Sequence, residues 1–127
     1  MLGSTKIVAF VPTRDAKKAR SFYEGLLGLR FVSEDRFAVV LDANGISVRV
    51  SNVPEFKPHQ FTILGWEVSE IEKVVSGLGE RGVHFEKYGF EGQDQQGVWT
   101  APTGDKVAWF KDPDGNILSV SQHISRT

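Results

Sequence analysis

The chain has 127 residues, 40% of them hydrophobic, and its 15 basic and 16 acidic side chains give a net charge of −1. These values predict one compact domain, or two small modules that share a core, and they exclude nucleic acid and membrane surfaces as partners attracted by bulk charge. The absence of cysteine excludes disulfides and thiolate sites, and without a leader pattern or a membrane-length apolar run we expect a cytoplasmic protein.

The first half of the chain predicts the order β-α-β-β-β. Residues 6–12 form an apolar run of strand length that Pro12 closes. Asp15 is placed to cap an amphipathic helix, and Gly28 is expected to end that helix in a left-handed conformation. Further strands are predicted at 29–32, 37–41 and 46–51.

The second half repeats this order after a proline-containing linker. Residues 61–68 predict a strand, and Ser69 and Glu72 have the spacing of a capping box ahead of a helix. The polar stretch 90–96 has no period and predicts an exposed loop. The last three strands are predicted at 97–100, 106–111 and 117–122.

Two similar turns mark the same point of each half. Asp112-Pro113-Asp114-Gly115 reverses the chain between the last two predicted strands, and Asp42-Ala43-Asn44-Gly45 is a weaker copy of it. Both contain residues that favour tight turns, so we interpret the aspartates as turn formers. The sequence therefore predicts one α+β domain over 1–127, in which βαβββ modules at about 5–52 and 60–122 are joined by linker 53–59.

The alternation of apolar and polar residues predicts a polar face on each sheet. Ile46, Val48 and Val50 are expected to face the helix, whereas Ser47, Arg49 and Ser51 point the other way. Ser119 and Ser121 alternate in the same manner with Leu118 and Val120 in the last strand. A curved mixed sheet with such a polar inner face predicts a cleft for a small-molecule ligand.

Two segments carry a resemblance to a known family: Asp15…Phe22-Tyr23…Leu27-Gly28-Leu29 and Phe110-Lys111-Asp112-Pro113-Asp114-Gly115-Asn116. At this spacing the chain resembles the vicinal oxygen chelate superfamily, which comprises glyoxalases, bleomycin-resistance proteins and extradiol dioxygenases. The resemblance covers about residues 5–122. It implies paired βαβββ modules and a homodimer, and it leaves the activity open because this scaffold hosts many reactions.

The resemblance also implies four inward-facing positions that hold a divalent metal in catalytic members. Here these positions are occupied by Val8, Arg49, Ile63 and Ser119. A divalent cation requires several imidazole or carboxylate ligands, and none of these four side chains supplies one. The sequence therefore predicts no metal and no other cofactor.

Seven residues are candidates for ligand binding. Arg49 and Glu67 are expected to face the same cleft, either as an internal ion pair or as anchors for the polar groups of a ligand. Aromatic residues are expected to stack on a planar ligand or to fill the cleft as packing, and Trp66 is expected in the core. The full candidate set is Phe10, Ser47, Arg49, Glu67, Trp99, Trp109 and Ser119. His59, His84 and His123 lack ligand spacing and are interpreted as surface or structural residues.

These residues predict a metal-free protein that binds a planar or aromatic small molecule. The alternative is a glyoxalase-like lyase or isomerase, or a dioxygenase-like enzyme, with atypical or no metal ligands, in which Glu67 acts as a base and Arg49 stabilises an oxyanion. A third interpretation is a partner-binding domain with a closed cleft. No catalytic residue is assigned.

Overall fold

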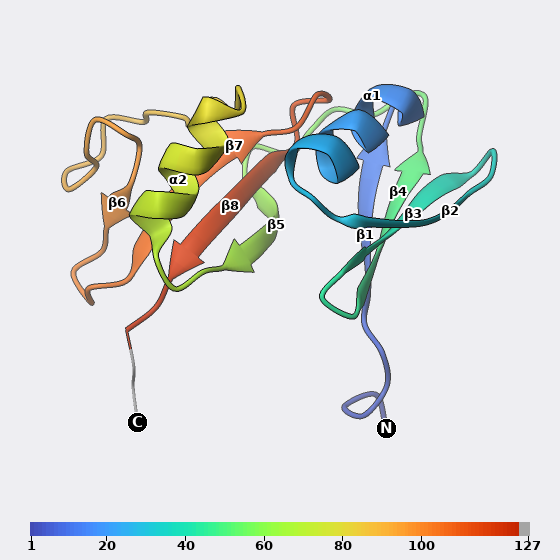
Figure 1. The fold of residues 1–127 in the computed structure, drawn as a ribbon, viewed down its shortest axis with the longest axis horizontal. Helices are drawn as coiled ribbons and strands as arrows, with labels where there is room; N and C mark the ends of the chain where they lie inside the picture. Colours follow the sequence, from blue (N-terminus) through green and yellow to red (C-terminus); the bar gives the residue numbers. More distant parts are fainter. Residues whose placement is uncertain (125–127) are drawn as a thin grey trace. The chain divides into compact units, whose positions relative to one another are not determined.

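The computed structural model describes residues 1–124 and divides the chain into two units, Met1–Pro58 and a second unit that begins at His59 (Figure 1). Each unit has one four-stranded sheet, and its strands and helical segment follow the order βαβββ. The predicted α+β class and the repeated βαβββ order are therefore confirmed.

The first sheet has the strand order β1-β4-β3-β2. Its strands are β1 (Val8–Thr13), β2 (Arg30–Glu34), β3 (Ala38–Ala43) and β4 (Ile46–Asn52). Strand β1 pairs in parallel with β4, and the other pairs are antiparallel. Val48 and Val50 are buried as the alternation predicts, but Ile46 is exposed because it directly follows the turn at the end of the sheet.

The helical segment of the first unit is less regular than the predicted amphipathic helix. Asp15 caps α1 (Ala16–Arg20), since its carboxylate accepts a hydrogen bond from Lys18 N at 3.1 Å. The chain continues as a π-helix, η1 (Ser21–Leu26), in which Phe22 and Tyr23 are buried. The wider turn is marked by the hydrogen bond from Leu27 N to Phe22 O at 3.0 Å, which spans five residues.

The second sheet has the order β5-β8-β7-β6. Its elements are β5 (Thr62–Glu67), α2 (Ile71–Glu80), β6 (Trp99–Thr100), β7 (Lys106–Lys111) and β8 (Ile117–Gln122). Strand β5 pairs in parallel with β8, and β7 pairs with both β8 and β6 in antiparallel fashion. The core face of β7 and β8 contains the buried side chains of Ala108, Phe110, Leu118 and Val120.

The predicted capping box of the second helix is wrong. The N-cap residue is Glu70, whose side chain makes no capping hydrogen bond. Instead, the side-chain oxygen of Gln122 accepts a hydrogen bond from Ile71 N at 2.9 Å. A residue at the end of β8 therefore supplies the acceptor for the first backbone N–H group of the helix. In the part of the chain that the structure describes, no helix has the length and apolar character needed to cross a membrane.

The turn between β7 and β8 is held by the buried carboxylate of Asp112. One carboxylate oxygen accepts hydrogen bonds from Asp114 N at 2.9 Å and Asn116 N at 3.0 Å, and the other accepts from the Asn116 side-chain amide at 2.8 Å. The earlier copy is weaker, since Asp42 accepts an exposed hydrogen bond from Gly45 N at 3.3 Å. Asp112 and Asp42 therefore act as turn formers of unequal strength.

We predict that Asp112→Ala destabilises the protein by about 2–4 kcal/mol, because it leaves buried N–H groups without their acceptor. Asp42→Ala is the matched control and should cost less than about 1 kcal/mol. Urea unfolding followed by circular dichroism measures both values. Equal losses in the two variants would contradict the unequal roles of the turns.

Candidate functional site

An open pocket of about 580 Å³ lies on the second unit, on the sheet face opposite the buried core face. Its volume falls within the range of roughly 300–1,000 Å³ that is typical of small-molecule sites. The lining residues come from the start of β5, the loop after α2 and the facing ends of β7 and β8: Gln60, Phe61, Thr62, Tyr88, Phe90, Trp109, Lys111 and Ile117.

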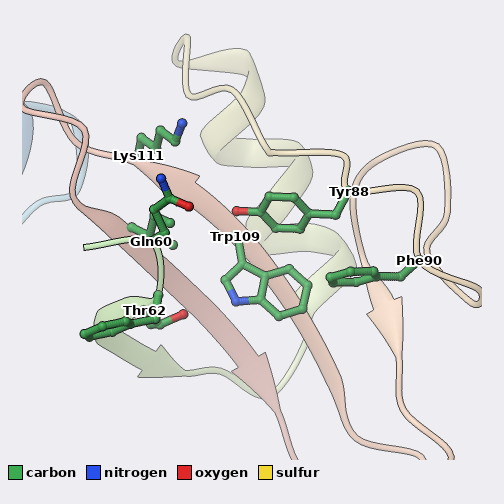
Figure 2. A pocket seen from close by; sticks show the side chains of 8 residues that line it. Gln60, Thr62, Tyr88, Phe90, Trp109 and Lys111 are labelled. Atoms are coloured by element: carbon green, nitrogen blue, oxygen red, sulfur yellow. The ribbon is translucent and has the colours of Figure 1, made fainter. Parts of the chain in front are cut away.

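The indole of Trp109 lies at the centre of this pocket (Figure 2). The ring centroids of Tyr88, Phe90 and Trp99 lie 5.6, 5.9 and 6.1 Å from that of Trp109. These separations are those of favourable aromatic pairs. Tyr88 and Phe90 are nevertheless 42% and 48% exposed, so the cluster presents open aromatic surface to the pocket and is not a sealed core.

Gln93 orders the loop that carries Tyr88 and Phe90. Its side-chain oxygen accepts hydrogen bonds from Tyr88 N at 2.8 Å and Gly89 N at 3.2 Å. Its side-chain nitrogen donates to Glu86 O and Gly97 O, both at 3.0 Å. One amide group therefore joins the two ends of the loop and positions the aromatic wall of the pocket.

Three further hydrogen bonds fix the stretch 90–96, which the sequence predicts only as an exposed polar loop. The carboxylate of Asp94 accepts hydrogen bonds from Gln96 N at 2.9 Å and Val98 N at 3.0 Å. The indole nitrogen of Trp99 donates to Glu91 O at 3.1 Å. The loop lies at the surface, but its polar side chains bond to its own backbone and give it a defined shape.

Polar groups gather at one end of the pocket. The Tyr88 hydroxyl points toward the side where Gln60 and Lys111 lie (Figure 2). The Lys111 ammonium lies 3.6 Å from the carboxylate of Glu86, and both side chains are partly exposed. Burial raises the pKa of the Tyr88 hydroxyl, and the negative charge of Glu86 raises it further. The tyrosine hydroxyl is therefore a protonated hydrogen-bond donor at neutral pH.

Three of the predicted ligand-binding residues lie at or beside this pocket. Trp109 lines it, Trp99 packs against Trp109, and Ser119 is the register partner of Trp109 in β8. Ser119 is buried over Gly65, where an added Cβ would lie only 2.5 Å from the serine hydroxyl oxygen. Trp66 lies on the other face, its ring 6.5 Å from that of Phe110, as the alternation predicts.

The other four candidates lie elsewhere. Phe10, Ser47 and Arg49 are in the first unit, where Phe10 is the register partner of Arg49 and is 64% exposed. Glu67 is an exposed residue at the end of β5 in the second unit. Because Arg49 and Glu67 belong to different units, both their ion pair and their role as ligand anchors stay predictions.

The four family-implied metal positions do not offer a suitable donor set. Val8 and Ile63 carry hydrocarbon side chains, Arg49 is a cation, and Ser119 offers only a neutral hydroxyl. Among residues 1–124, no group of three or more histidine, aspartate and glutamate side chains is placed to hold a metal ion. These residues therefore do not fit the divalent metal that the fold family implies.

Of the eight lining residues, Trp109 is the one that the sequence-based candidate set contains; the missed residues are Gln60, Phe61, Thr62, Tyr88, Phe90, Lys111 and Ile117. A signal was present for Lys111, since it follows Trp109 by two positions and strand alternation places both on one face. Tyr88 and Phe90 flank Gly89 where the predicted loop 90–96 begins, and two large aromatic side chains at a surface are a sign of binding. Gln60 and Thr62 have no comparable signal.

Comparisons with known proteins agree on one family. The family model described as the Glyoxalase/Bleomycin resistance protein/Dioxygenase superfamily matches residues 6–120. A solved structure of a member of this superfamily from Sphaerobacter thermophilus is 24% identical, with a TM-score of 0.76 and coverage of 97% of this chain and 100% of that chain. None of the curated proteins that were searched matches significantly.

Two further solved structures share the fold at lower identity. A glyoxalase/bleomycin resistance protein/dioxygenase from Nocardioides is 16% identical, with a TM-score of 0.72 and coverage of 97% of this chain and 85% of that chain. A lactoylglutathione lyase from Agrobacterium tumefaciens is 13% identical, with a TM-score of 0.73 and coverage of 94% and 93%. At these identities the likeness establishes the fold alone.

We predict that Gln93→Glu disorders the wall of the pocket. A carboxylate keeps the acceptor for Tyr88 N and Gly89 N, but it sets a second acceptor against the carbonyls of Glu86 and Gly97. The variant should lose about 1–3 kcal/mol of stability and much of its near-ultraviolet circular dichroism. Gln95→Glu, with the same change of charge at an exposed neighbour, should stay within about 0.5 kcal/mol of wild type. An intact aromatic spectrum in Gln93→Glu would contradict this role.

Proposed function

The chain belongs to the Glyoxalase/Bleomycin resistance protein/Dioxygenase superfamily, and from this premise we propose that it binds a planar or aromatic small molecule without a metal ion. The observation that carries the proposal is the pocket of the second unit, with the Trp109 indole at its centre and exposed aromatic side chains beside it. A planar ligand that covers these rings gains both apolar burial and aromatic contact.

The shape of the lining supports a flat ligand. Tyr88 and Phe90 approach Trp109 at interplanar angles of 64° and 85°. They therefore stand nearly edge-on to the indole and act as walls, whereas Trp109 serves as the stacking surface. Phe61 and Ile117 add apolar surface to the lining, and Gln60 and Thr62 supply the few polar groups that orient a ligand in such sites.

The chemistry of the family-implied metal positions supports a metal-free mode of binding. Offsetting the lost hydration of a divalent cation takes several carboxylate or imidazole ligands at once. Arg49 would instead bring a positive charge to the site of the ion, and a single serine hydroxyl is a weak neutral donor.

The pocket favours binding over proton-transfer catalysis. A general base for reaction at neutral pH needs a pKa near that pH. The raised pKa of Tyr88 moves its hydroxyl further from this requirement. Glu67 is the general base in the alternative hypothesis of a glyoxalase-like or dioxygenase-like enzyme, and it is not among the residues that line the pocket. A homodimer and a cytoplasmic location stay predictions.

We predict that metal chelation leaves the protein unchanged. Protein purified without chelator should contain far less than one equivalent of any divalent metal per chain, as measured by inductively coupled plasma mass spectrometry. Neither EDTA nor added Mn²⁺, Zn²⁺ or Ni²⁺ should shift the thermal midpoint. A stoichiometric metal that stabilises on re-addition would overturn the metal-free proposal and favour the glyoxalase-like or dioxygenase-like enzyme.

We predict that the neutral aromatic probe 2-naphthalenemethanol binds beside Trp109. In ¹⁵N-labelled protein, titration should shift the indole N–H resonances of Trp99 and Trp109 and leave that of Trp66 in place, because Trp66 lies on the core face. Trp109→Ala should weaken binding, followed at Trp99, by about tenfold or more. Trp66→Phe is the matched control and should retain wild-type affinity. Absence of any indole shift at millimolar probe would contradict the proposed function.

A further inference from the structure

We propose that the pocket of the second unit selects aromatic carboxylates, with the ring of the ligand on Trp109 and its carboxylate on Lys111. This inference rests on the proposed function and adds the charge of the ligand to it. Lys111 is not one of the four family-implied metal positions, so the carboxylate-binding role proposed for it does not come from the resemblance.

The first support is the charge of the lining. Of the eight residues that line the pocket, Lys111 is the charged one, and the others are aromatic, aliphatic or neutral polar. An anionic group on the ligand is therefore attracted to one end of the site, whereas a cationic group is repelled there and finds no acidic lining residue.

The second support is the spacing along β7. Lys111 follows Trp109 by two residues on the same face, so their backbones are separated by about 6.6 Å along the strand. A carboxylate attached to a ring that lies on the Trp109 indole extends in the plane of the ring and covers such a distance. The flexible stem of lysine allows its ammonium to follow the carboxylate.

The third support is the set of neutral donors at the same end. The Tyr88 hydroxyl points toward the side of Gln60 and Lys111 (Figure 2), and its raised pKa keeps it protonated. The Gln60 amide and the Thr62 hydroxyl supply further donors in the lining. A carboxylate accepts several such hydrogen bonds, and those to an ionised group are the strong ones.

The negative charge of Glu86 repels an anionic ligand. Removing this charge should therefore change the affinity in the direction opposite to removing the charge of Lys111. Its carboxylate lies 3.6 Å from the Lys111 ammonium, and the two side chains are 29% and 50% exposed. A pair of this length and exposure contributes little to stability, so exchanging it for a ligand carboxylate costs little. Glu86 does not line the pocket, and its removal should strengthen the binding of an anion.

The test compares three probes of one shape and different charge: 2-naphthoate, 2-naphthalenemethanol and 2-naphthylmethylammonium. Each is titrated at pH 7 into the full chain, and binding is followed by the indole resonances of Trp99 and Trp109. We expect 2-naphthoate to bind about three- to tenfold more tightly than the alcohol and the ammonium probe to bind most weakly. Added salt should weaken only the binding of 2-naphthoate appreciably.

Three variants locate the source of this preference. Lys111→Gln should weaken 2-naphthoate about three- to tenfold while leaving the alcohol within about twofold. Lys111→Arg should retain the preference, since it keeps the positive charge. Glu86→Gln should strengthen 2-naphthoate and leave the alcohol unchanged. Thermal midpoints of the three variants verify that each is folded under the conditions of the titration.

The outcomes separate this inference from the proposed function. Equal binding of 2-naphthoate and the alcohol would overturn the carboxylate selectivity and leave the aromatic site intact. An equal loss of both probes in Lys111→Gln would also overturn it, since lysine would then act by shape and not by charge. Binding of none of the three probes would remove the proposed function, and this inference would fail with it.

Discussion

The buried carboxylate of Asp112 fixes the hairpin of β7 and β8, and the second unit depends on the register that this turn sets. With Trp109 opposite Ser119 and Phe110 opposite Leu118, one aromatic ring faces the pocket and the next faces the core. Because side chains alternate along a strand, a slip of one residue would exchange the two faces. The same short segment therefore supplies both the hydrophobic core and the surface on which a ligand can stack.

Strands β7 and β8 form the floor of the pocket, and the loop from Glu86 to Gly97 forms its wall. The two parts are held in place by different kinds of hydrogen bond. The floor is a pair of hydrogen-bonded strands, whereas the loop from Glu86 to Gly97 contains little regular structure and is ordered by the side-chain amide of Gln93. The loop is also tied to the floor, since Glu86 N donates to Trp109 O at 2.8 Å. Aromatic side chains with substantial exposure can hold fixed positions in such an arrangement because their backbone is hydrogen-bonded.

The fold was accessible from the sequence because repeated turns, strand alternation and helix ends all pointed to one βαβββ unit used twice. Alternation also placed Trp66 on the core face, where it is half-buried beside Phe110. The errors arose where a single side-chain contact outside the repeating pattern decides the local structure. Gln122 caps α2 from 51 residues away, and the amide of Gln93 decides where Tyr88 lies. Neither contact produces a repeating pattern in the sequence. Strand alternation therefore predicts the floor of the pocket but not the loop that forms its wall.

The close approach of Gly65 to Ser119 couples the side chains that these two positions can hold. A methyl group at position 65 would collide with the serine hydroxyl oxygen at 2.5 Å and lie 3.3 Å from the Ser119 backbone oxygen, whereas the serine Cβ is 3.8 Å away. An alanine at position 65 therefore requires the Ser119 hydroxyl to turn away or to be absent, and its methyl group stays in tight contact with the Ser119 backbone oxygen in either case. The residues at positions 65 and 119 are therefore energetically coupled across the β5–β8 pair, and the cost of a change at one position depends on the side chain at the other.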